Sequence, residues 1–296
     1  MDFKELEYFS TIVKCGNLTH AARQLYVSQP TLSKFLQKLE EDLGLVLFQR
    51  GSRRLKLTYA GQRYYAHVER ILSQKREMDA EMTDILRSDR GVLYVGIPPF
   101  RCSFSLPKVL PIFHKEFPQV QFRIIEAPSA VLDQKLLNGE IDLAFYMSFE
   151  RITGLSYQVM HSDKMYAILS KGHPLEAKAA QIGEFSLEWL AGQTLLLQNR
   201  TQRQGQYILQ ELEKRRIQPA EILESSNIRA AAALAANGYG IGFLSGELLE
   251  HLELNIPFGA YPLQNCTLHI ESVAAWRTGD YLPRYAQAFI KLMEQV

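Results

Sequence analysis

A short stretch of the chain combines small, hydrogen-bonding and cationic side chains at helical spacing. One face of a helix there would hold Pro30, Ser33, Lys34 and Gln37, and no acidic residue follows until Glu40. Hydroxyl and amide groups can hydrogen-bond to base edges, and a lysine can meet a phosphate or a guanine. No carboxylate on this face would repel a phosphate backbone. The pattern therefore favours a helix that binds in the major groove of DNA.

Three helices are expected to position this face. Apolar residues at i, i+3 and i+7 predict a first helix over residues 3–15, and Asn17 can cap a short second helix. Ser28 can cap the third helix, with Pro30 in the first turn, where a missing N–H group costs little. The buried face of the third helix would hold Leu32, Phe35, Leu36 and Leu39. Two helices joined by a tight turn, the second with a polar face, predict a helix-turn-helix.

A basic segment follows the third helix. Leu45, Leu47 and Phe48 predict an apolar strand, and residues 50–56 predict a basic hairpin, or wing, beside it. Residues 11–63 contain nine basic and three acidic residues, whereas the whole chain has a formal net charge of +1. This concentration of positive charge suggests a polyanionic partner. The alternative is a plain three-helix core with a solvated basic face.

A longer helix with a different repeat comes next, capped by Thr58 and ended near Gly91. Spacings of four and three residues alternate through Tyr64, Val68, Ile71, Lys75, Met78, Met82 and Ile85. This period of 3.5 is typical of a coiled-coil seam, and about 28 residues would span ~40 Å. We therefore expect dimerisation through the six of these residues that are apolar, all except Lys75. The alternative is one long helix packed on its own domain.

Strands and helices alternate after residue 91. LYVGI, VQFRIIE and IDLAFY predict strands, and the helix over 130–138 would be capped by Ser129. This βαβ order predicts a parallel sheet. A second unit begins near Met165 and ends with GYGIGFL, after which CTLHIESVAAW returns to the first unit. Two α/β halves joined by two crossings predict a hinged clamp that binds a ligand at the carboxyl ends of the strands.

Taken together, these motifs resemble the LysR-type transcriptional regulators. AARQLYVSQPTLSKFLQKLEEDLGLVLFQR followed by LTYAG is similar to that family's winged helix-turn-helix. LLNGEIDLAF, SKGHPL and ANGYGIGFL are similar to its effector domain, so the resemblance covers nearly the whole chain. It implies a sequence-specific transcription factor controlled by a small-molecule effector.

The expected fold class is a multidomain α+β and α/β chain. A winged helix-turn-helix domain at 1–58 and a coiled-coil linker helix at 59–90 precede an effector domain at 91–296 that resembles periplasmic binding proteins. Subdomain I would combine 91–162 with 266–296, and subdomain II would span 163–265. The resemblance implies a homodimer that assembles into a homotetramer. It also implies a promoter operator with an interrupted palindrome in double-stranded DNA, and RNA polymerase as a further partner.

The resemblance also assigns residues to DNA binding. The expected set is Gln29, Pro30, Thr31, Ser33, Lys34, Gln37, Arg50, Arg53, Arg54 and Thr58. Those up to Gln37 lie on the recognition helix, the arginines match positions in the wing, and Thr58 matches a residue that touches a phosphate.

The expected effector-binding residues lie at the ends of the predicted strands. They are Pro99, Phe100, Arg101, Cys102, Ser103, Pro128, Ser129, Tyr146, Gln198, Asn199, Arg200, Thr201, Ser226 and Asn227. Many family members have Ser or Thr where this chain has Phe100 and Pro128, so a hydroxyl cradle for a carboxylate is partly missing. Arg101, Arg200 or Arg203 can supply charge, and we expect a small organic anion. The alternative is that the arginines are solvated and Phe100 is core.

Other function classes find little support. Three cysteines without a CxxC pair match neither a disulfide scaffold nor a structural zinc site, and no metal or cofactor is expected. The charged start is not a signal peptide and no segment is long enough to span a membrane, so a cytoplasmic location is expected. No nucleophile elbow or phosphate loop indicates an enzyme. Two rivals remain: a small-molecule sensor whose basic domain binds protein or non-specific nucleic acid, and an enzyme that turns over without DNA.

Overall fold

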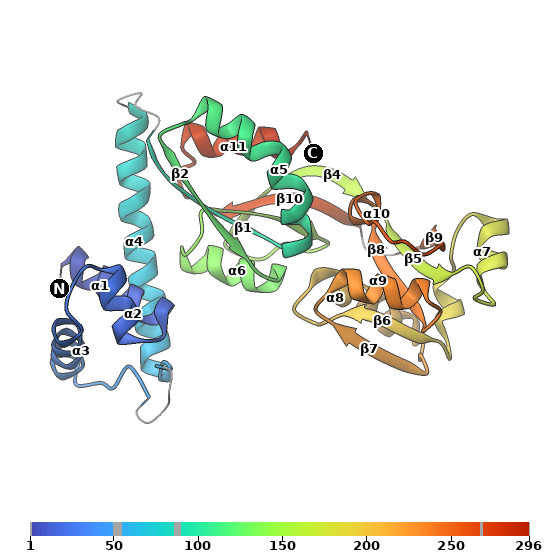
Figure 1. Ribbon diagram of the computed structural model, residues 1–296, viewed down its shortest axis with the longest axis horizontal. Helices are drawn as coiled ribbons and strands as arrows, with labels where there is room; N and C mark the ends of the chain where they lie inside the picture. Colours follow the sequence, from blue (N-terminus) through green and yellow to red (C-terminus); the bar gives the residue numbers. More distant parts are fainter. Residues whose placement is uncertain (1, 50–54, 86–89, 267–268, 296) are drawn as a thin grey trace. The chain divides into compact units, whose positions relative to one another are not determined.

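The computed structural model describes residues 2–49, 55–85, 90–266 and 269–295 of the 296-residue chain. The chain divides into two compact units, one made of residues 1–88 with 137–140 and the other of the remainder. Figure 1 shows the first unit, in blue and cyan, as helices, and the second as two sheets flanked by helices. This arrangement confirms the predicted fold class.

Four helices form the described part of the first unit. They are α1 Phe3–Cys15, α2 Leu18–Gln24, α3 Gln29–Leu43 and α4 Tyr59–Ile85. The Asn17 side chain accepts hydrogen bonds from the N–H groups of Thr19 and His20, and the Ser28 hydroxyl accepts one from Thr31 N–H. Both predicted caps are therefore confirmed. These caps are local interactions, which is why sequence alone could locate the helix starts.

The helices of the first unit pack around one apolar core. Leu32 and Leu36 of α3 are buried in it, and Phe35 and Leu39 are half-buried against it, as predicted. The opposite face of α3 is left exposed.

The segment after α3 differs from the predicted strand. Leu47 and Phe48 are buried, but Leu45 is half exposed, and only an isolated antiparallel bridge joins Phe48 to Leu57 in the described residues. The Glu40 carboxylate accepts hydrogen bonds from the N–H groups of Leu47 and Phe48 at 2.6 and 3.1 Å. This contact with Glu40 fixes residues 47 and 48, where a longer run of strand pairing had been expected.

The described residues of the second unit form two five-stranded sheets. Sheet I has the order β2-β1-β3-β10-β4, and sheet II has the order β7-β6-β8-β5-β9. The strands are β1 Gly91–Ile97, β2 Val120–Glu126, β3 Leu143–Ser148, β4 Leu155–Asp163, β5 Met165–Ser170, β6 Thr194–Gln198, β7 Glu221–Ser225, β8 Ile241–Ser245, β9 Phe258–Pro262 and β10 Ile270–Arg277.

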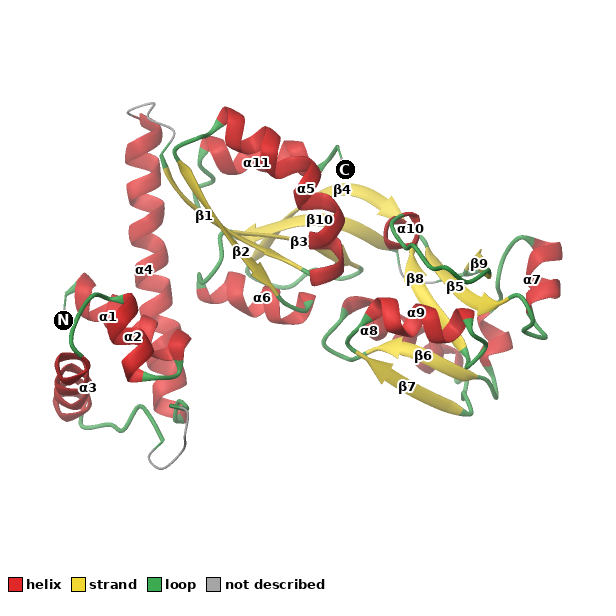
Figure 2. Ribbon diagram, in the orientation of Figure 1, coloured by secondary structure: helices red, strands yellow, loops and turns green. Residues whose placement is uncertain are grey.

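Helices flank both sheets (Figure 2). They are α5 Pro99–Glu116, α6 Ser129–Asn138, α7 Glu176–Ile182, the 3-10 helix η1 Leu187–Leu190, α8 Arg203–Arg215, α9 Ile228–Ala236, α10 Gly246–Glu250 and α11 Arg284–Met293. Each sheet has its own apolar core, so the two sheets with their helices are two subdomains. We call the half built on sheet I subdomain I and the half built on sheet II subdomain II.

The parallel arrangement predicted for the first three strands is confirmed, but both sheets are mixed. β1 is parallel to β2 and β3, and β6 is parallel to β7 and β8. However, β10 is antiparallel to β3 and β4, and β5 is antiparallel to β8 and β9. The chain crosses between the sheets at Lys164 and again between Pro262 and Ile270, so the strands next to the crossings enter their sheets in the opposite direction. β4 and β9 were not predicted.

Ser129 does not cap α6, which corrects a second prediction. It is the first residue of the helix, and its hydroxyl accepts a hydrogen bond from the N–H group of Arg203 at 3.1 Å. That partner is 74 residues away in the other subdomain, so the local pattern could not reveal it.

Candidate nucleic-acid interface and ligand cavity

The exposed face of α3 presents the predicted recognition residues together. We call this the recognition face; it consists of Gln29, Pro30, Thr31, Ser33, Lys34 and Gln37, all of which are exposed. The Thr31 and Ser28 hydroxyls lie 2.8 Å apart, and the Gln37 amide donates to the Glu41 carboxylate at 2.9 Å. The first turn of α3 contains no acidic residue. This end of the helix can therefore approach a polyanion without charge repulsion.

The predicted wing residues Arg50, Arg53 and Arg54 lie outside the described residues. Thr58 is described, and its hydroxyl donates to the carbonyl of Val46 at 2.7 Å while accepting from Gly61 N–H at 3.0 Å. It caps α4, as predicted. Because its one proton is used inside the fold, a phosphate contact at this position would come from backbone N–H groups in the first turn of α4.

Two of the predicted seam residues of α4 face their own domain. Val68 is buried in the core of the first unit, and Tyr64 packs edge-on against Phe9, with ring centroids 4.8 Å apart. This corrects their assignment to dimerisation, because the first part of the predicted seam packs against the core of its own unit. Ile71, Met78 and Met82 are 37%, 54% and 49% exposed, while the Ile85 side chain lies outside the described residues.

A buried carboxylate joins α4 to α1. Glu69 is fully buried, and it accepts hydrogen bonds from the Ser10 hydroxyl at 2.5 Å and from the Lys14 ammonium at 3.1 Å. Buried carboxylates are stable only when they are paired in this way. The contact fixes α4 against the helix-turn-helix.

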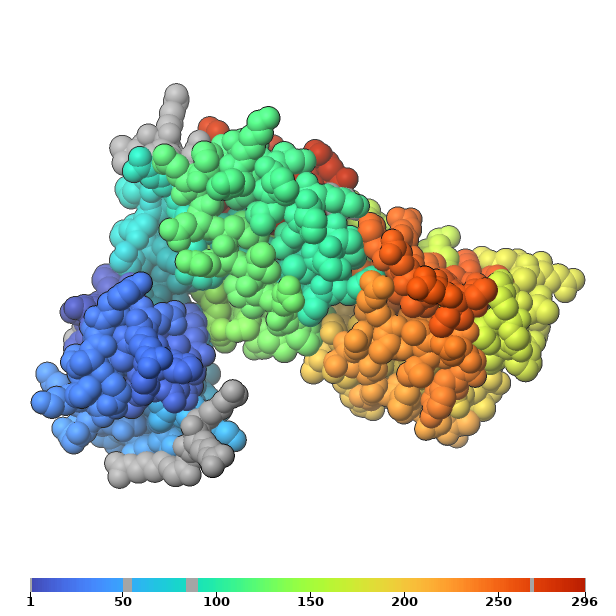
Figure 3. All heavy atoms as spheres, viewed as in Figure 1, coloured from blue at the N-terminus to red at the C-terminus, as the bar shows by residue number. Residues whose placement is uncertain are grey.

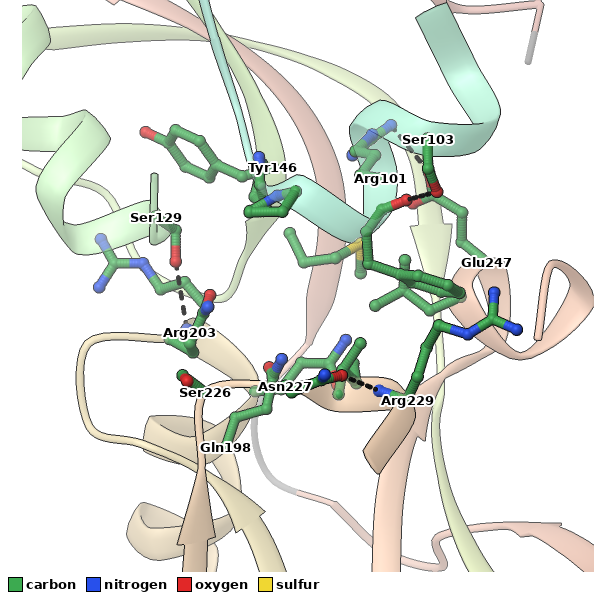
Figure 4. A pocket seen from close by; sticks show the side chains of 18 residues that line it. Arg101, Ser103, Ser129, Tyr146, Gln198, Arg203, Ser226, Asn227, Arg229 and Glu247 are labelled. Carbon is green, nitrogen blue, oxygen red and sulfur yellow. Dashed lines mark hydrogen bonds and ion pairs between the residues drawn. The ribbon is translucent and has the colours of Figure 1, made fainter. Parts of the chain in front are cut away.

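The second unit contains a cavity of about 500 Å³ between its two subdomains. Its walls are formed by Pro98, Pro99, Phe100, Arg101, Ser103, Ser129, Tyr146, Met147, Gln198, Gln202, Arg203, Gln204, Ser226, Asn227, Ile228, Arg229, Glu247 and Leu248. Figure 4 shows Ser103, Ser129 and Tyr146 on one side and Gln198, Ser226 and Asn227 on the other. In Figure 3 the green atoms of subdomain I lie directly against the orange atoms of subdomain II.

Nine of the fourteen predicted effector residues line this cavity, and five do not. The five are Cys102, Pro128, Asn199, Arg200 and Thr201. Cys102 turns into the core of subdomain I, and burial raises the pKa of its thiol to about 12. The Asn199 side chain accepts hydrogen bonds from the Thr201 N–H and hydroxyl, and Arg200 is 77% exposed beside Glu224. Residues 199–201 of the loop after β6 thus lie outside the cavity wall, whereas Gln202 at the end of the loop is part of it.

A buried ion pair closes one side of the cavity. The Arg101 guanidinium lies 3.0 Å from the Glu247 carboxylate and donates to the Ser272 hydroxyl at 2.6 Å. Burial lowers the pKa of Arg101 and by itself would raise the pKa of Glu247. The neighbouring His161 ring, 3.6 Å away, and the charge of Arg101 outweigh burial, so the pKa of Glu247 lies below its usual range. The Glu247 carboxylate therefore stays ionised at neutral pH, where it faces the Arg101 guanidinium.

A second buried arginine lies on another side of the cavity. Here the arginine belongs to subdomain II and its carboxylate partners belong to subdomain I. Arg203 of α8 pairs with Asp133 of α6 and with Glu150, and Tyr146 donates to the same Asp133 carboxylate. Burial raises the pKa of Asp133 against the lowering effects of Tyr146 and Arg203. Ion pairs that cross from each subdomain to the other therefore hold the two walls of the cavity together.

The cavity also collects helix N-termini and an exposed cation. α5 begins at Pro99 without a side-chain cap, and α9 begins at Ile228 after Asn227. The Arg229 guanidinium donates to the Glu253 carbonyl at 3.1 Å and lies 5.9 Å from the centre of the Phe100 ring. Helix N-termini and an arginine favour a negatively charged group, while Phe100, Ile228 and Leu248 provide an apolar wall.

Comparison with known proteins decides the family. The model of the bacterial regulatory helix-turn-helix proteins of the lysR family matches residues 3–62. The model of the LysR substrate binding domain matches residues 86–296, which is more than half of the chain. The chain belongs to the LysR family. It is a LysR-type transcriptional regulator with a helix-turn-helix DNA-binding domain and a substrate-binding domain.

Individual LysR relatives extend over the full length. The transcriptional regulator BsdA of Bacillus subtilis (strain 168) is 27% identical over 307 residues, covering 99% of this chain and 100% of that protein. A full-length OxyR variant from Pseudomonas aeruginosa superposes with a TM-score of 0.75 at 24% identity, over 99% of this chain and 94% of that one. Full-length CbnR complexed with its target DNA superposes at 0.63 with 23% identity, over 100% and 99%. These likenesses show a shared LysR fold.

Several cavity residues of this LysR protein were not among the individually predicted effector residues. They are Pro98, Met147, Gln202, Gln204, Ile228, Arg229, Glu247 and Leu248. Arg229 could have been found, because it lies in the first turn after the predictable cap Asn227. Glu247 could not, since nothing local indicates that β8 ends beside Arg101.

One group of side chains in the LysR domain has metal-ligating types. Ligand atoms of His161, Asp163 and Glu247 lie within 4.8 Å of one another. Yet Asp163 accepts hydrogen bonds from the N–H groups of Gly246 and Glu247, and Glu247 faces Arg101. Asp163 is therefore occupied as a helix cap, while Glu247 is ion-paired with Arg101 although neither of its buried carboxylate oxygens has a hydrogen-bond partner. Among the described helices none is long and apolar enough to cross a membrane.

Proposed function

We propose that the protein binds an operator as a dimer, with one α3 in each of two successive major grooves. The observation that carries this is the recognition face, on which every predicted base-contacting side chain is exposed and no acidic residue occupies the first turn. Side chains at the start of a recognition helix contact base edges, and two-fold dimers bind half-sites separated by whole helical turns. The operator would then be an interrupted palindrome in promoter DNA, with RNA polymerase as the partner that the bound regulator influences.

A footprint of the full-length protein on the DNA upstream of its own gene tests this proposal. We expect two protected segments of related sequence, with centres separated by about 10 bp or a multiple of it. A single protected segment, or uniform protection without preference, would contradict the dimeric operator.

Dimerisation would use the distal part of α4. Ile71, Met78 and Met82 lie on one face at spacings of seven and four residues and expose apolar surface that monomeric proteins usually bury. We infer that such dimers assemble further into a homotetramer, as the family resemblance implies.

We also propose that the cavity binds a small organic anion. A volume of about 500 Å³ suits a small metabolite. Arg101 and Arg203 are neutralised by buried carboxylates, so Arg229, with the N-termini of α5 and α9, is the group to which an anion would bind. The apolar wall formed by Phe100, Ile228 and Leu248 would hold the body of the ligand.

Thermal unfolding with a panel of small carboxylates and their neutral amides tests the anion site. The two tryptophans, Trp189 and Trp276, both lie in the substrate-binding domain, so tryptophan fluorescence follows that domain alone. Carboxylates that stabilise the wild type should lose this effect in Arg229→Gln and keep it in the matched control Arg200→Gln. Equal stabilisation by amides and carboxylates would contradict an anionic effector.

The effector would act by favouring one arrangement of the two subdomains. It can shift that equilibrium only by the difference between its affinities for the two arrangements. The ion pairs of Arg101 and Arg203 link the subdomains on either side of the cavity, so an effector that strengthens or weakens these contacts would alter the relation between them.

A further inference from the structure

Glu40 is the first acidic residue after the recognition face, and a carboxylate is unfavourable at its place in the helix. It lies three residues before the end of α3, where the helix dipole places partial negative charge. The last turn of α3 contains no basic residue that would compensate. A carboxylate on a helix that approaches DNA is also repelled by the phosphates. An acidic group at this position therefore needs a reason.

The Glu40 carboxylate binds the backbone that follows the helix. Its Oε1 atom accepts hydrogen bonds from the N–H groups of Leu47 at 2.6 Å and Phe48 at 3.1 Å. Both of these residues have buried side chains. We call residues 46–49 the entry segment, because they lead into the wing. A hydrogen bond to a carboxylate is roughly twice as strong as one between neutral groups, so Glu40 links the end of α3 firmly to the entry segment.

The opposite edge of the entry segment pairs with the chain that returns from the wing. Gln49 N–H donates to the Lys56 carbonyl at 2.8 Å. Thr58 N–H donates to the Leu47 carbonyl at 2.9 Å. In an antiparallel pair, the N–H group between two such bonds points away from the partner. Glu40 binds this outward-facing N–H group and so takes the place of a neighbouring strand.

The start of α4 lies against the same segment. The Thr58 hydroxyl donates to the Val46 carbonyl at 2.7 Å. A Cβ atom on Gly61 would lie 2.1 Å from the Leu47 carbonyl oxygen, so a residue without a side chain is required for this close approach. Contacts therefore run without interruption from α3 through Glu40 and the entry segment to the first turn of α4.

We propose that Glu40 is a positioning residue for DNA binding. It fixes the entry segment against α3, so that the wing reaches the DNA backbone beside the base pairs that the recognition face contacts. Two binding elements held in one rigid arrangement lose less freedom on association than two that move independently. Glu40 itself does not touch the DNA. This proposal rests on the binding of α3 in the major groove and adds to it the residue that aligns α3 with the wing.

Fluorescence anisotropy of the full-length protein on a labelled duplex, across a salt series, tests this role. The duplex is enriched from genomic fragments by repeated selection with the wild type, and circular dichroism identifies a temperature at which each variant is folded. Glu40→Ala removes the acceptor and should weaken binding about 10-fold. The slope of log affinity against log salt should fall by about one, because a misplaced wing neutralises fewer phosphates. A purely structural role would leave the slope of the folded protein unchanged.

A double-mutant cycle with Arg53→Ala shows whether Glu40 acts through the wing. In the wild type, Arg53→Ala should reduce the salt slope by about one. In the Glu40→Ala background it should have little further effect, since the two substitutions remove the same contribution. Additive effects would mean that Glu40 and the wing act independently.

Two matched variants separate positioning from charge and from misfolding. Glu40→Gln keeps the shape and an acceptor oxygen but loses the charge, so binding should weaken by only about 3-fold. It also replaces Glu40→Ala in the cycle if the alanine variant does not fold. Asp42→Asn removes an exposed carboxylate from the same turn and should bind at least as tightly as the wild type.

Three results would overturn the proposal. The first is wild-type or higher affinity of Glu40→Gln, which would leave only the repulsion between its charge and the phosphates. The second is an unchanged salt slope, or additivity with Arg53→Ala. The third is wild-type binding by Arg53→Ala alone, since the wing would then contribute nothing that needs alignment. If the wild type bound the selected duplex no better than a random one, operator binding itself would be contradicted, so the two failures are distinguishable.

Discussion

The guanidinium of Arg101, at the start of α5, lies 3.0 Å from the carboxylate of Glu247 in α10 and so joins the two subdomains of the LysR substrate-binding domain. Both side chains are buried, and both line the cavity. The same carboxylate lies 3.6 Å from His161 at the end of β4, close to the first crossing between the sheets. This cluster therefore links the cavity wall to the segment about which the subdomains would hinge.

Removing one partner of this pair should destabilise the domain strongly. Glu247→Gln leaves the buried Arg101 charge uncompensated, which we expect to cost about 3–5 kcal/mol. Urea unfolding followed by tryptophan fluorescence measures the change. Glu250→Gln, on the exposed side of the same helix, should have no effect. The double variant Arg101→Met, Glu247→Met should recover most of the loss, and a double variant as unstable as the single one would contradict this account.

The His161–Glu247 contact should make stability depend on pH. The Glu247 carboxylate, 3.6 Å away, raises the pKa of His161 above its ordinary value of 6.5. The folded state therefore holds this proton more tightly than the unfolded state, and the extra stability is fully present below pH 6.5 and lost as pH rises through the higher folded value. Arg101, Asp163 and His251 are the other charged or titratable groups around this contact.

A pH series from 5.5 to 9 checks this expectation at constant ionic strength. The melting temperature of the wild type should fall relative to that of His161→Gln as pH rises above about 6.5. Parallel curves for the two proteins would show that the contact has no influence on stability.

Substitutions on the recognition face and in the wing should have different effects. Ser33→Ala should cost about 1–3 kcal/mol at particular base pairs of the operator and leave others unaffected. Arg53→Ala should weaken binding to all sequences alike and reduce the salt slope by about one. Titration of a set of single-base operator variants distinguishes the two patterns. Unchanged discrimination by Ser33→Ala would remove Ser33 from the recognition residues.

The buried Glu69 should matter for the DNA-binding unit alone. Ser10→Ala removes one of its hydrogen-bond donors, so we expect a loss of about 1–3 kcal/mol in the stability of that unit. Far-UV circular dichroism follows the helices of both units, while tryptophan fluorescence follows only the substrate-binding domain. We expect an earlier melting step by circular dichroism and an unchanged transition by fluorescence. A shift of the fluorescence transition would show that the two units do not unfold independently.

The exposed face of α4 should set the oligomeric state. Met78→Glu and Met82→Glu place charges on the apolar face and should remove the α4 interface, so that the mass of the assembly falls by about half at micromolar concentration. Glu81→Gln, an exposed neighbour on the same helix, is the matched control. Sedimentation equilibrium gives the masses directly, and wild-type assembly in both glutamate variants would assign the interface elsewhere.

Local interactions explain which features were predictable. Caps such as Asn17 and Ser28 bind N–H groups within three residues. Strands that consist of apolar runs are likewise predictable, because their side chains are adjacent in sequence. The recognition face could be located for the same reason, because one helix carries all of it.

Long-range contacts explain the errors. The heptad spacing predicted a face of α4 but not its partner, and the core around Phe9 covers Tyr64 and Val68. Ser129 has the residue type of a cap, yet its hydroxyl is bound by Arg203 in the other subdomain. Glu247 became a cavity residue only when the fold brought α10 against α5.

Binding of the full-length protein to an operator duplex and to a scrambled duplex, across a salt series, tests the central claim most directly. The account predicts a preference of about 10³-fold or more for the operator at physiological salt. It also predicts that Ser33→Ala reduces this preference. Equal binding to both duplexes, with an equally steep salt dependence, would mean that only the backbone charge is recognised and would contradict sequence-specific regulation by the recognition face.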